Sequence, residues 1–349
     1  MKRIPCHFAK RCMLALLPLL IIAQSACSEK TEAAEPVSQQ GYYLDTICQI
    51  DIYAMESMTE ETALAAADNA FALCSEYESL LSKTREGSDI WNINHAGGQP
   101  VTCDARTIAI LHQSLAYGEL SGGRFDITIG QASDLWDFHS DAPAVPDKAQ
   151  LAEAIRHVDY TMIQVDGNQV SLADPAGEID LGGIAKGYIA DQMATCLQDQ
   201  GVTGAVINLG GNVTLVGAKD GAKEPFRVAI RLPFGDGRQT LGVIAMTDGT
   251  TVTSGSYERY FTQDGKLYHH ILDVDTGYPA ASDVASVTIL GPAGSSCDCD
   301  ALATICFLFG TEQGAALIEG MDGFEAIFVD ADGQIIDIAG EGRYDFTAN

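Results

Sequence analysis

The chain has 349 residues, of which 46% are hydrophobic and 19% are charged. That apolar fraction is ordinary for a globular protein and too high for a disordered one. The sequence has 20 lysine and arginine residues against 48 aspartate and glutamate residues, a formal net charge of −28. Such an acidic surface repels phosphate backbones and so argues against nucleic-acid binding, although one metal ion could still hold a small phosphorylated ligand.

The first 26 residues are typical of an export signal. Four basic residues and no acidic residue occur within residues 1–12, and an apolar run follows from Met13 to Ala23. This run is too short for a membrane-spanning helix, which needs about 20 residues. We therefore expect a signal peptide over residues 1–26.

Cys27 follows the small residues Ser25 and Ala26, a pattern that resembles the lipobox of bacterial lipoproteins. In that motif the cysteine is acylated and becomes the mature N-terminus, although Gln24 stands where an aliphatic residue is usual. Plain secretion with a chance cysteine is the alternative. We expect an exported, membrane-anchored lipoprotein at the periplasmic or outer face of the cytoplasmic membrane, with residues 27–40 as a polar tether.

The remaining sequence, residues 41–345, contains no repeat and no Pro-rich linker, which predicts one domain. Hydrophobic periodicity predicts helices over residues 60–81, 105–120, 184–200, 300–309 and 311–321. Strands are expected over residues 42–53, 205–208, 226–231, 242–247, 251–254, 267–273 and 284–290, with hairpins over 162–173 and 324–338. Because strands and helices are grouped rather than strictly alternating, the pattern favours an α+β fold.

One motif extends from Glu178 to Asp191, where a strand carrying Asp180 leads through two glycines into a helix with Lys186 in its first turn. Glycines allow close approach to a ligand, and helix N-termini favour anions. A lysine at this position would contact a phosphate as a point charge. The spacing is not that of a P-loop. The alternative is a glycine-rich turn with a surface lysine.

Asp300 and Thr304 are four residues apart and therefore share one face of a helix. Their oxygens are hard ligands suited to Mg²⁺, which usually completes its shell with water and phosphate. The alternative is an N-cap role for Asp300, with Thr304 facing solvent. Cys297 and Cys299 lie nearby, but a C-x-C pair without a second Cys or His pair is weak evidence for zinc.

Three further glycine-rich segments, residues 121–128, 208–212 and 253–259, are ordinary turns when each is considered alone. His269 and His270 follow one another in an expected strand, so they point to opposite faces and at most one of them enters a given site.

Taken together and in this order, the motifs resemble those of the ApbE family of FAD:protein FMN transferases, which are often exported bacterial lipoproteins. The resemblance covers about Tyr42 to Asp332 and implies a single ApbE-like (T-fold-like) domain with mixed or antiparallel sheets and flanking helices. The motifs that carry it are Gly122-Gly-x-Phe-Asp126, Asp180-Leu-Gly-Gly-Ile-Ala-Lys-Gly-Tyr188, Asn208-Leu-Gly-Gly211, Thr253-Ser-Gly255, His270-Ile-x-Asp273 with Thr276-Gly277, and Asp300-Ala-Leu-Ala-Thr304.

The resemblance implies that the protein splits the FAD pyrophosphate with Mg²⁺ and attaches FMN through a phosphoester to a Thr or Ser of an acceptor, releasing AMP. The acceptor would be an exported protein of a flavin-dependent electron-transfer system. The metal would lie on Asp300, Thr304 and the carbonyl of Gly183, and His270 or Asp273 would accept the hydroxyl proton. The residues expected to contact FAD are Leu44, Thr84, Arg124, Phe125, Asp126, Asp180, Lys186 and His270.

Some positions depart from the family pattern: Leu44-Asp45 replaces a common Met-Gly pair, and Lys83-Thr84 follows Ser82 where an aromatic residue is common. Two other functions stay open. Water could attack in place of the acceptor, which would make the protein an FAD pyrophosphatase, or the protein could bind FAD without catalysis. The joint presence of Asp300 and Thr304 favours an enzyme over a binding protein.

Overall fold

The computed structural model describes residues 35–349 except residues 139 and 141. The expected signal peptide over residues 1–26, the expected lipidation site Cys27 and residues 28–34 of the expected tether lie outside the described residues. Residues 35–349 form one contact unit.

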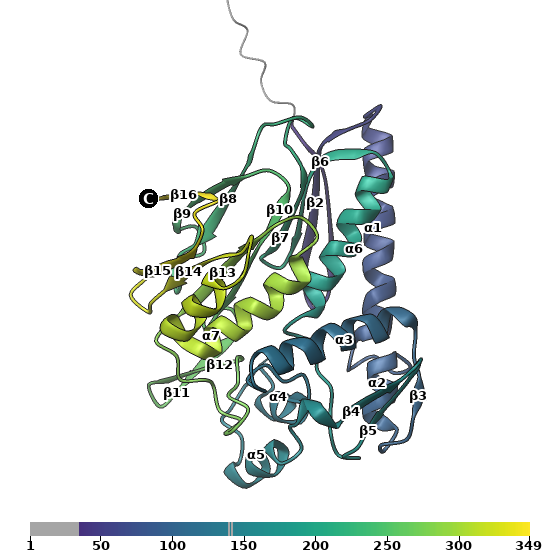
Figure 1. Ribbon diagram of the computed structural model, residues 1–349, viewed down its shortest axis with the longest axis vertical. Helices are drawn as coiled ribbons and strands as arrows, with labels where there is room; N and C mark the ends of the chain where they lie inside the picture. The colour runs from purple at the N-terminus through teal and green to yellow at the C-terminus, as the bar shows by residue number, and fades with distance from the viewer. Residues whose placement is uncertain (1–34, 139, 141) are drawn as a thin grey trace, which may run out of the picture. The chain divides into compact units, whose positions relative to one another are not determined.

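The fold is built on an eight-stranded sheet in which every pair of neighbouring strands is antiparallel (Figure 1). The strand order is β1-β2-β6-β7-β10-β13-β14-β15. The strands are β1 (Val37–Tyr43), β2 (Thr46–Met55), β6 (Val202–Leu209), β7 (Asn212–Gly217), β10 (Gly249–Gly255), β13 (Ser286–Gly291), β14 (Glu325–Val329) and β15 (Ile335–Gly340).

Three smaller antiparallel sheets accompany the large one, in the orders β16-β9-β8, β3-β5-β4 and β11-β12. Their strands are β3 (Val101–Thr102), β4 (Ile163–Asp166), β5 (Gln169–Leu172), β8 (Phe226–Arg231), β9 (Thr240–Met246), β11 (Tyr260–Gln263), β12 (Lys266–His269) and β16 (Asp345–Ala348). The helices are α1 (Glu60–Leu81), α2 (Asp89–His95), α3 (Ala105–Leu120), α4 (Gly130–Trp136), α5 (Lys148–Ile155), α6 (Ala185–Asp199) and α7 (Ser296–Glu319).

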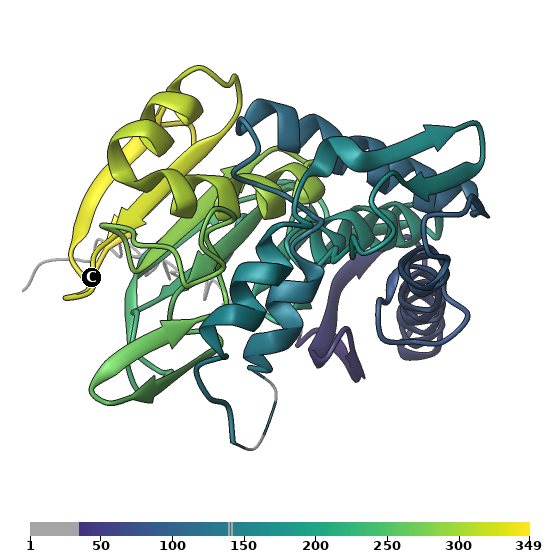
Figure 2. The same cartoon turned by 90° about the horizontal axis from the view of Figure 1, so that it is seen from below.

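Two layers cover the large sheet. Helices α1, α6 and α7 pack on one face, where Ile50 of β2 and Ile289 of β13 are fully buried. The β16-β9-β8 sheet packs on the other face, against Leu290. Leu290 follows Ile289 in β13, and adjacent residues of a strand point to opposite faces. β13 is therefore buried along its whole length. In the view from below, α1 and the yellow C-terminal strands lie on opposite sides, as the strand order requires (Figure 2).

The α+β prediction is confirmed, and so are several elements. The helices expected over residues 60–81 and 105–120 have the expected bounds, and the helix expected over 184–200 is α6. The hairpin expected over 162–173 is β4–β5.

Other boundaries were wrong. Residues 37–40 of the expected tether belong to β1, which pairs with β2 at the sheet edge and has alternating exposure. The strand expected over 42–53 is two strands joined by a tight turn. Residues 270–273 leave the strand expected over 267–273. Residues 346–348, beyond the expected domain end, pair with β9. The strands β7 and β11 and the short helices α2, α4 and α5 were not predicted.

Helix α7 begins at Ser296 rather than at residue 300, and the two helices expected there follow one another across a kink at Gly310. Gly310 has φ 73°, which interrupts the helix. By length and apolar composition α7 could cross a membrane, but it is the core helix of the domain, since Leu302 and Phe307 are fully buried.

The N-terminal ends of α6 and α7 meet, and each helix caps the other. No side chain at the first position before either helix caps it. Instead, Asp300 of α7 accepts a hydrogen bond from the N–H of Gly187 in the first turn of α6, at 2.9 Å. Asp191 of α6 accepts hydrogen bonds from the N–H groups of Ser296 and Cys297 in the first turn of α7, at 3.0 and 2.9 Å. Both carboxylates thus satisfy orphan donors at the positive end of a helix dipole.

This approach requires glycine at position 187. A Cβ on Gly187 would lie 2.1 Å from the carbonyl oxygen of Ser296 and 2.8 Å from Cβ of Asp300. Backbone would have to move to relieve such a clash. The glycine that follows Lys186 therefore sets the spacing of the two helices.

The mutual capping predicts that Asp191→Ala destabilises the protein by about 1–2 kcal/mol, because two N–H groups of α7 lose their acceptor. Urea unfolding of wild type and variant measures the difference. Asp199→Ala is the matched control, since Asp199 is an exposed carboxylate on the same helix and its loss should change stability by less than about 0.5 kcal/mol. Equal stability of the two variants would contradict the capping role.

Candidate active site

A cavity of about 1210 Å³ opens where the large sheet loses a partner strand. β10 pairs with β7 only as far as Thr251, opposite Val213. Beyond this point Thr253 and Ser254 of β10 have no β7 partner, and both line the cavity. The gap lets residues from the helical layer and from β8 line the same space.

The structure brings most of the predicted site residues together. Asp273 is the exception, because it is not part of the cavity lining. The predicted residues that line the cavity are Leu44, Thr84, Arg124, Phe125, Asp126, Asp180, Gly183, Lys186, His270, Asp300 and Thr304.

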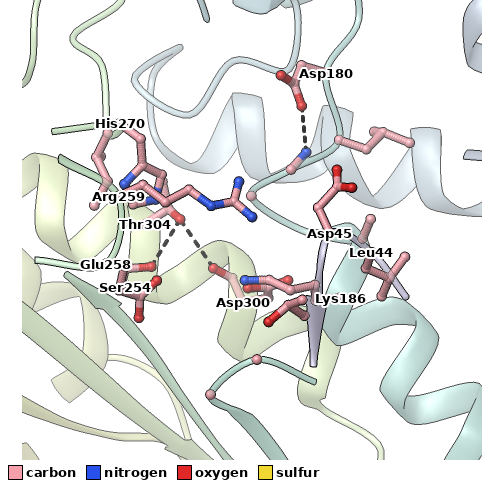
Figure 3. Close-up of a pocket in the computed structure, with 18 of the residues that line it drawn as sticks. Leu44, Asp45, Asp180, Lys186, Ser254, Glu258, Arg259, His270, Asp300 and Thr304 are labelled. Carbon is pink, nitrogen blue, oxygen red and sulfur yellow. Dashed lines mark hydrogen bonds between the residues drawn. The ribbon is translucent and has the colours of Figure 1, made fainter. Parts of the chain in front are cut away.

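Asp300 and Thr304 lie one turn apart on α7 and both face the cavity (Figure 3). Because α7 begins four residues before Asp300, this carboxylate is not the N-cap of its own helix. Asp300 is buried, and burial raises the pKa of its carboxyl, while Lys186 and the N–H of Gly187 lower it. The hydroxyl of Thr304 lies 3.3 Å from that of Ser254.

Gly183 lies beside Thr304 and Phe125. A Cβ at this position would lie 3.6 Å from Oγ1 of Thr304 and 3.1 Å from the ring of Phe125. The backbone at Gly183 thus reaches the hydroxyl that shares a helix face with Asp300. Carboxylate, hydroxyl and carbonyl oxygens are the ligand types that Mg²⁺ prefers.

The donor set fits a magnesium ion that a substrate helps to hold. Among residues 35–349, as far as the structure describes them, no group of three or more His, Cys, Asp or Glu side chains could hold a metal. The predicted set has a single carboxylate, Asp300, so further ligands would come from water and from phosphate. Mg²⁺ is commonly held in this way, by one or two carboxylates together with substrate phosphates.

The first turn of α6 provides an anion-binding surface. Gly182, Gly183, Ala185 and Lys186 line the cavity at the N-terminal end of the helix. The positive end of the helix dipole and the lysine ammonium both favour a phosphate group here. The half-buried Lys186 faces the cavity, unlike a surface lysine in a glycine-rich turn.

The two adjacent histidines face different cavities, as expected. His270 lines the active-site cavity, whereas His269 lines a second cavity of about 250 Å³. Burial first, and then Arg259 and Lys186, lower the pKa of His270 to about 3, so the ring is neutral at neutral pH. Its Nδ1 atom has no hydrogen-bond partner within the described part of the chain.

Asp273 lies in a turn instead of in the cavity. One of its oxygens accepts hydrogen bonds from the N–H and the hydroxyl of Thr276, both at 2.9 Å. The other lies 3.4 Å from the guanidinium of Arg124. Of the two residues predicted as the base, His270 is therefore the one that faces the cavity.

Asp180 is positioned by a half-buried lysine, Lys83, which the sequence alone marks only as a departure from the family pattern. Nζ of Lys83 lies 3.2 Å from Asp180, 3.4 Å from Glu178 and 2.5 Å from Asp134. Burial lowers the pKa of Lys83, but the three carboxylates raise it by more, so the lysine stays charged. The other oxygen of Asp180 accepts the N–H of Gly182 at 2.8 Å, which orders the turn into α6.

Asp126 has a supporting role in the cavity wall. Its carboxylate accepts hydrogen bonds from the N–H and hydroxyl of Thr128, at 2.8 and 2.6 Å, and from the N–H of Tyr160, at 2.8 Å. These bonds hold the loop that presents the buried ring of Phe125 beside Gly183.

The Leu44-Asp45 turn forms part of the cavity rim. Both residues have left-handed backbone, with φ 54° and 56°, a conformation that costs non-glycine residues energy. The N–H of Leu44 donates to Oε1 of Glu78 on α1 at 2.9 Å, which fixes the turn.

Two charged residues of the cavity were not predicted as site residues. Glu258 and Arg259 follow the Thr253-Ser254-Gly255 motif and line the cavity (Figure 3). Glu258 lines the cavity, and protein surrounds the rest of its side chain. This burial raises the pKa of its carboxyl, and Lys186 and Arg259 lower that pKa by less. The charge of Glu258 and Arg259, and their place in the 253–259 segment, were the sequence signals that could have identified them as site residues.

Comparison with known proteins agrees with this geometry. The ApbE family profile matches residues 44–328. The chain is 34% identical to an FAD:protein FMN transferase of Treponema pallidum, covering 94% of this chain and 93% of that protein. It is 36% identical to an FAD:protein FMN transferase of Klebsiella pneumoniae, covering 78% of this chain and 84% of that protein. The crystal structure of an ApbE protein of Thermotoga maritima matches with a TM-score of 0.77 at 30% identity, covering 85% of this chain and 95% of that one.

The family match extends over most of the chain and includes every cavity-lining motif described above. The sequence similarity and the shared fold lead to the same assignment. The chain belongs to the ApbE family and is a flavin transferase.

Proposed function

We propose that this protein transfers the FMN half of FAD to a Thr or Ser hydroxyl of an exported acceptor protein, with Mg²⁺, and releases AMP. The observation that carries the proposal is the position of Asp300 and Thr304. The hydroxyl of Thr304 lies near Gly183, and the carboxylate of Asp300 lies at the positive end of α6. Both residues line a cavity that a neutral histidine also faces.

The reaction balances without any further co-reactant. The acceptor hydroxyl oxygen bonds to the phosphorus of the FMN half, and the bond from that phosphorus to the bridging oxygen breaks. AMP leaves with the bridging oxygen, and the hydroxyl proton passes to a base. FAD and the hydroxyl thus become an FMN phosphoester, AMP and one proton.

The residues of the chain divide this work. Lys186 and the first turn of α6 bind and orient the pyrophosphate. The neutral ring of His270, which lines the cavity, is the candidate to accept the hydroxyl proton, and the negative pyrophosphate beside it would raise the low pKa of the ring. Asp300, Thr304 and the Gly183 carbonyl would hold Mg²⁺. The ion would neutralise negative charge on the pyrophosphate and on the departing AMP.

The proposal includes an exported, membrane-anchored location, supported by the signal-like residues 1–26 and the lipobox-like Cys27. It places the enzyme where an exported acceptor of an electron-transfer system would meet it. The described domain begins its first strand at Val37, so few residues separate this domain from the expected lipid.

Asp300→Asn should lower Mg²⁺-dependent transfer by at least about 100-fold. The amide carbonyl can still accept the hydrogen bond of Gly187, so the capping of α6 survives while the carboxylate charge is lost. Intact mass of a candidate acceptor domain, incubated with FAD and Mg²⁺, measures the FMN adduct, and AMP release is followed in parallel.

The control for this test is Glu312→Gln, an exposed carboxylate on the second half of α7, which should retain wild-type activity. Full activity of Asp300→Asn, or wild-type activity that EDTA does not reduce, would refute the metal assignment. If the wild type releases FMN and AMP without labelling any acceptor, the protein is a pyrophosphatase. If FAD remains intact, it is a binding protein.

Cys27→Ala should move the full-length protein from the membrane fraction to the soluble exported fraction, because the acyl chains supply the membrane affinity. Globomycin treatment of cells with the wild-type protein should block signal cleavage at Cys27. Cys306→Ala serves as the control, because Cys306 is a fully buried cysteine of α7. Unchanged fractionation of Cys27→Ala would rule out the anchor.

A further inference from the structure

The free edge of strand β8 borders the active-site cavity. In the described part of the chain β8 pairs with β9 alone, at the end of the β16-β9-β8 sheet. Its last four residues, Val228 to Arg231, all line the cavity. Since alternate residues of a strand point to opposite faces, four consecutive lining residues mean that the strand turns its edge toward the cavity. Such an edge carries unpaired N–H and C=O groups.

This edge carries positive charge in a strongly acidic protein. Arg227 and Arg231 are both exposed and, four residues apart, lie on the same face of β8, with the small Ala229 between them. The guanidinium of Arg231 lies 6.0 Å from the ring centroid of Tyr257 at the cavity wall. Two arginines beside the cavity, against a net charge of −28, favour a partner that is acidic at this point.

The chemistry requires a backbone to enter this cavity. A Thr or Ser side chain is short, so the acceptor main chain must pass close to the phosphorus that its hydroxyl attacks. The cavity, at about 1210 Å³, is larger than the roughly 300–1,000 Å³ of an ordinary small-molecule site, which leaves space for a peptide segment beside a nucleotide.

We propose that β8 binds the acceptor by strand addition. An extended acceptor segment pairs with the free edge of β8, and acidic side chains of that segment face Arg227 and Arg231. Main-chain hydrogen bonds supply binding and alternate side chains supply selectivity, as in other cases of strand addition. This inference rests on the proposed transfer to a protein hydroxyl and names where that protein binds.

The first experiment uses two synthetic peptide pools with a central Thr and otherwise randomised positions. One pool has Glu, and the other Lys, at the second position on each side of the Thr. Each is incubated with the full-length protein, FAD and Mg²⁺, and FMN adducts are counted by mass. The wild type should label the Glu pool about three- to tenfold more than the Lys pool, and Arg227→Glu together with Arg231→Glu should reverse this order.

Matched variants separate docking from flavin chemistry. Arg227 does not line the cavity, so Arg227→Glu alone should leave FAD affinity unchanged while it raises the KM for the Glu pool. Arg156→Glu is the control, because Arg156 is an exposed arginine of the loop after α5, outside the cavity lining. It should change neither quantity.

A second experiment tests the main-chain pairing itself. Backbone N-methylation is moved one position at a time along the most strongly labelled peptide. Strand addition uses the N–H groups of every second residue, so labelling should fall at alternate positions on both sides of the Thr. Loss at no position, or at all positions equally, would refute the strand-addition geometry.

The outcomes distinguish this inference from the function on which it rests. Adducts on both pools with no charge preference, together with an unaffected Arg227→Glu variant, would overturn docking at β8 and leave the transferase intact. If Arg227→Glu instead causes self-association without a change in labelling, the arginines only protect a sheet edge, and the docking inference is wrong. No adduct on peptides or on any acceptor domain, with FAD cleaved to FMN and AMP, would refute transfer and the docking inference together.

Discussion

The mutual capping of α6 and α7 is the interaction on which the site depends. Asp300 closes the first turn of α6, and Asp191 closes the first turn of α7. The same Asp300 is the single carboxylate of the predicted metal site, so one residue joins the fold to the chemistry. Because Gly187 allows the helix ends to touch, the positive end of α6, Lys186 and the oxygens of α7 occupy one small volume. Lys186 and the positive end of α6 stabilise the buried Asp300 carboxylate, which can still attract a cation.

The position of the cavity follows from the strand pairing. β7 begins at Asn212, and its ladder with β10 stops at Thr251, so within residues 35–349 as described β10 continues toward Gly255 without a strand partner on that side. An uninterrupted sheet would separate the helical layer from the β8–β9 layer. At this gap the two layers face each other, which places an anion-binding helix end opposite a free strand edge. This arrangement suits a flavin transferase, since the helix end can hold a nucleotide and the proposed strand addition would admit a protein chain to the same cavity.

The sequence predicts those features that lie within one element. The four-residue spacing of Asp300 and Thr304 and the glycines before Lys186 are local patterns, and the structure brings both pairs to one cavity. Features that arise from tertiary contacts were not predictable in this way. The choice between an N-cap and a cavity-facing role for Asp300 depended on where α7 begins. The three carboxylates around Lys83 come from residues 134–180, about fifty or more positions away, and no periodicity links them. The cavity lining by β8 depends on which sheet the strand joins. The short helices α2 and α4 offered too few turns to show a hydrophobic pattern.

The turn at Leu44 and Asp45 shows how this chain maintains a strained rim without glycine. Two successive left-handed residues cost about 1–3 kcal/mol each, and strain of that size persists only where the surroundings fix the backbone. Here Tyr43 pairs with Thr46 across the β1–β2 hairpin, and Glu78 accepts the N–H of Leu44. The strand pairing and the hydrogen bond to Glu78 both act within residues 43–46. They hold Leu44 and Asp45 in the left-handed conformation that glycine would adopt freely. The consequence is chemical: Leu44 keeps an apolar side chain at the first position, and Asp45 adds a carboxylate where glycine has no side chain, with both residues lining the cavity. The cavity wall is therefore more negative at this turn than a Met-Gly turn would make it.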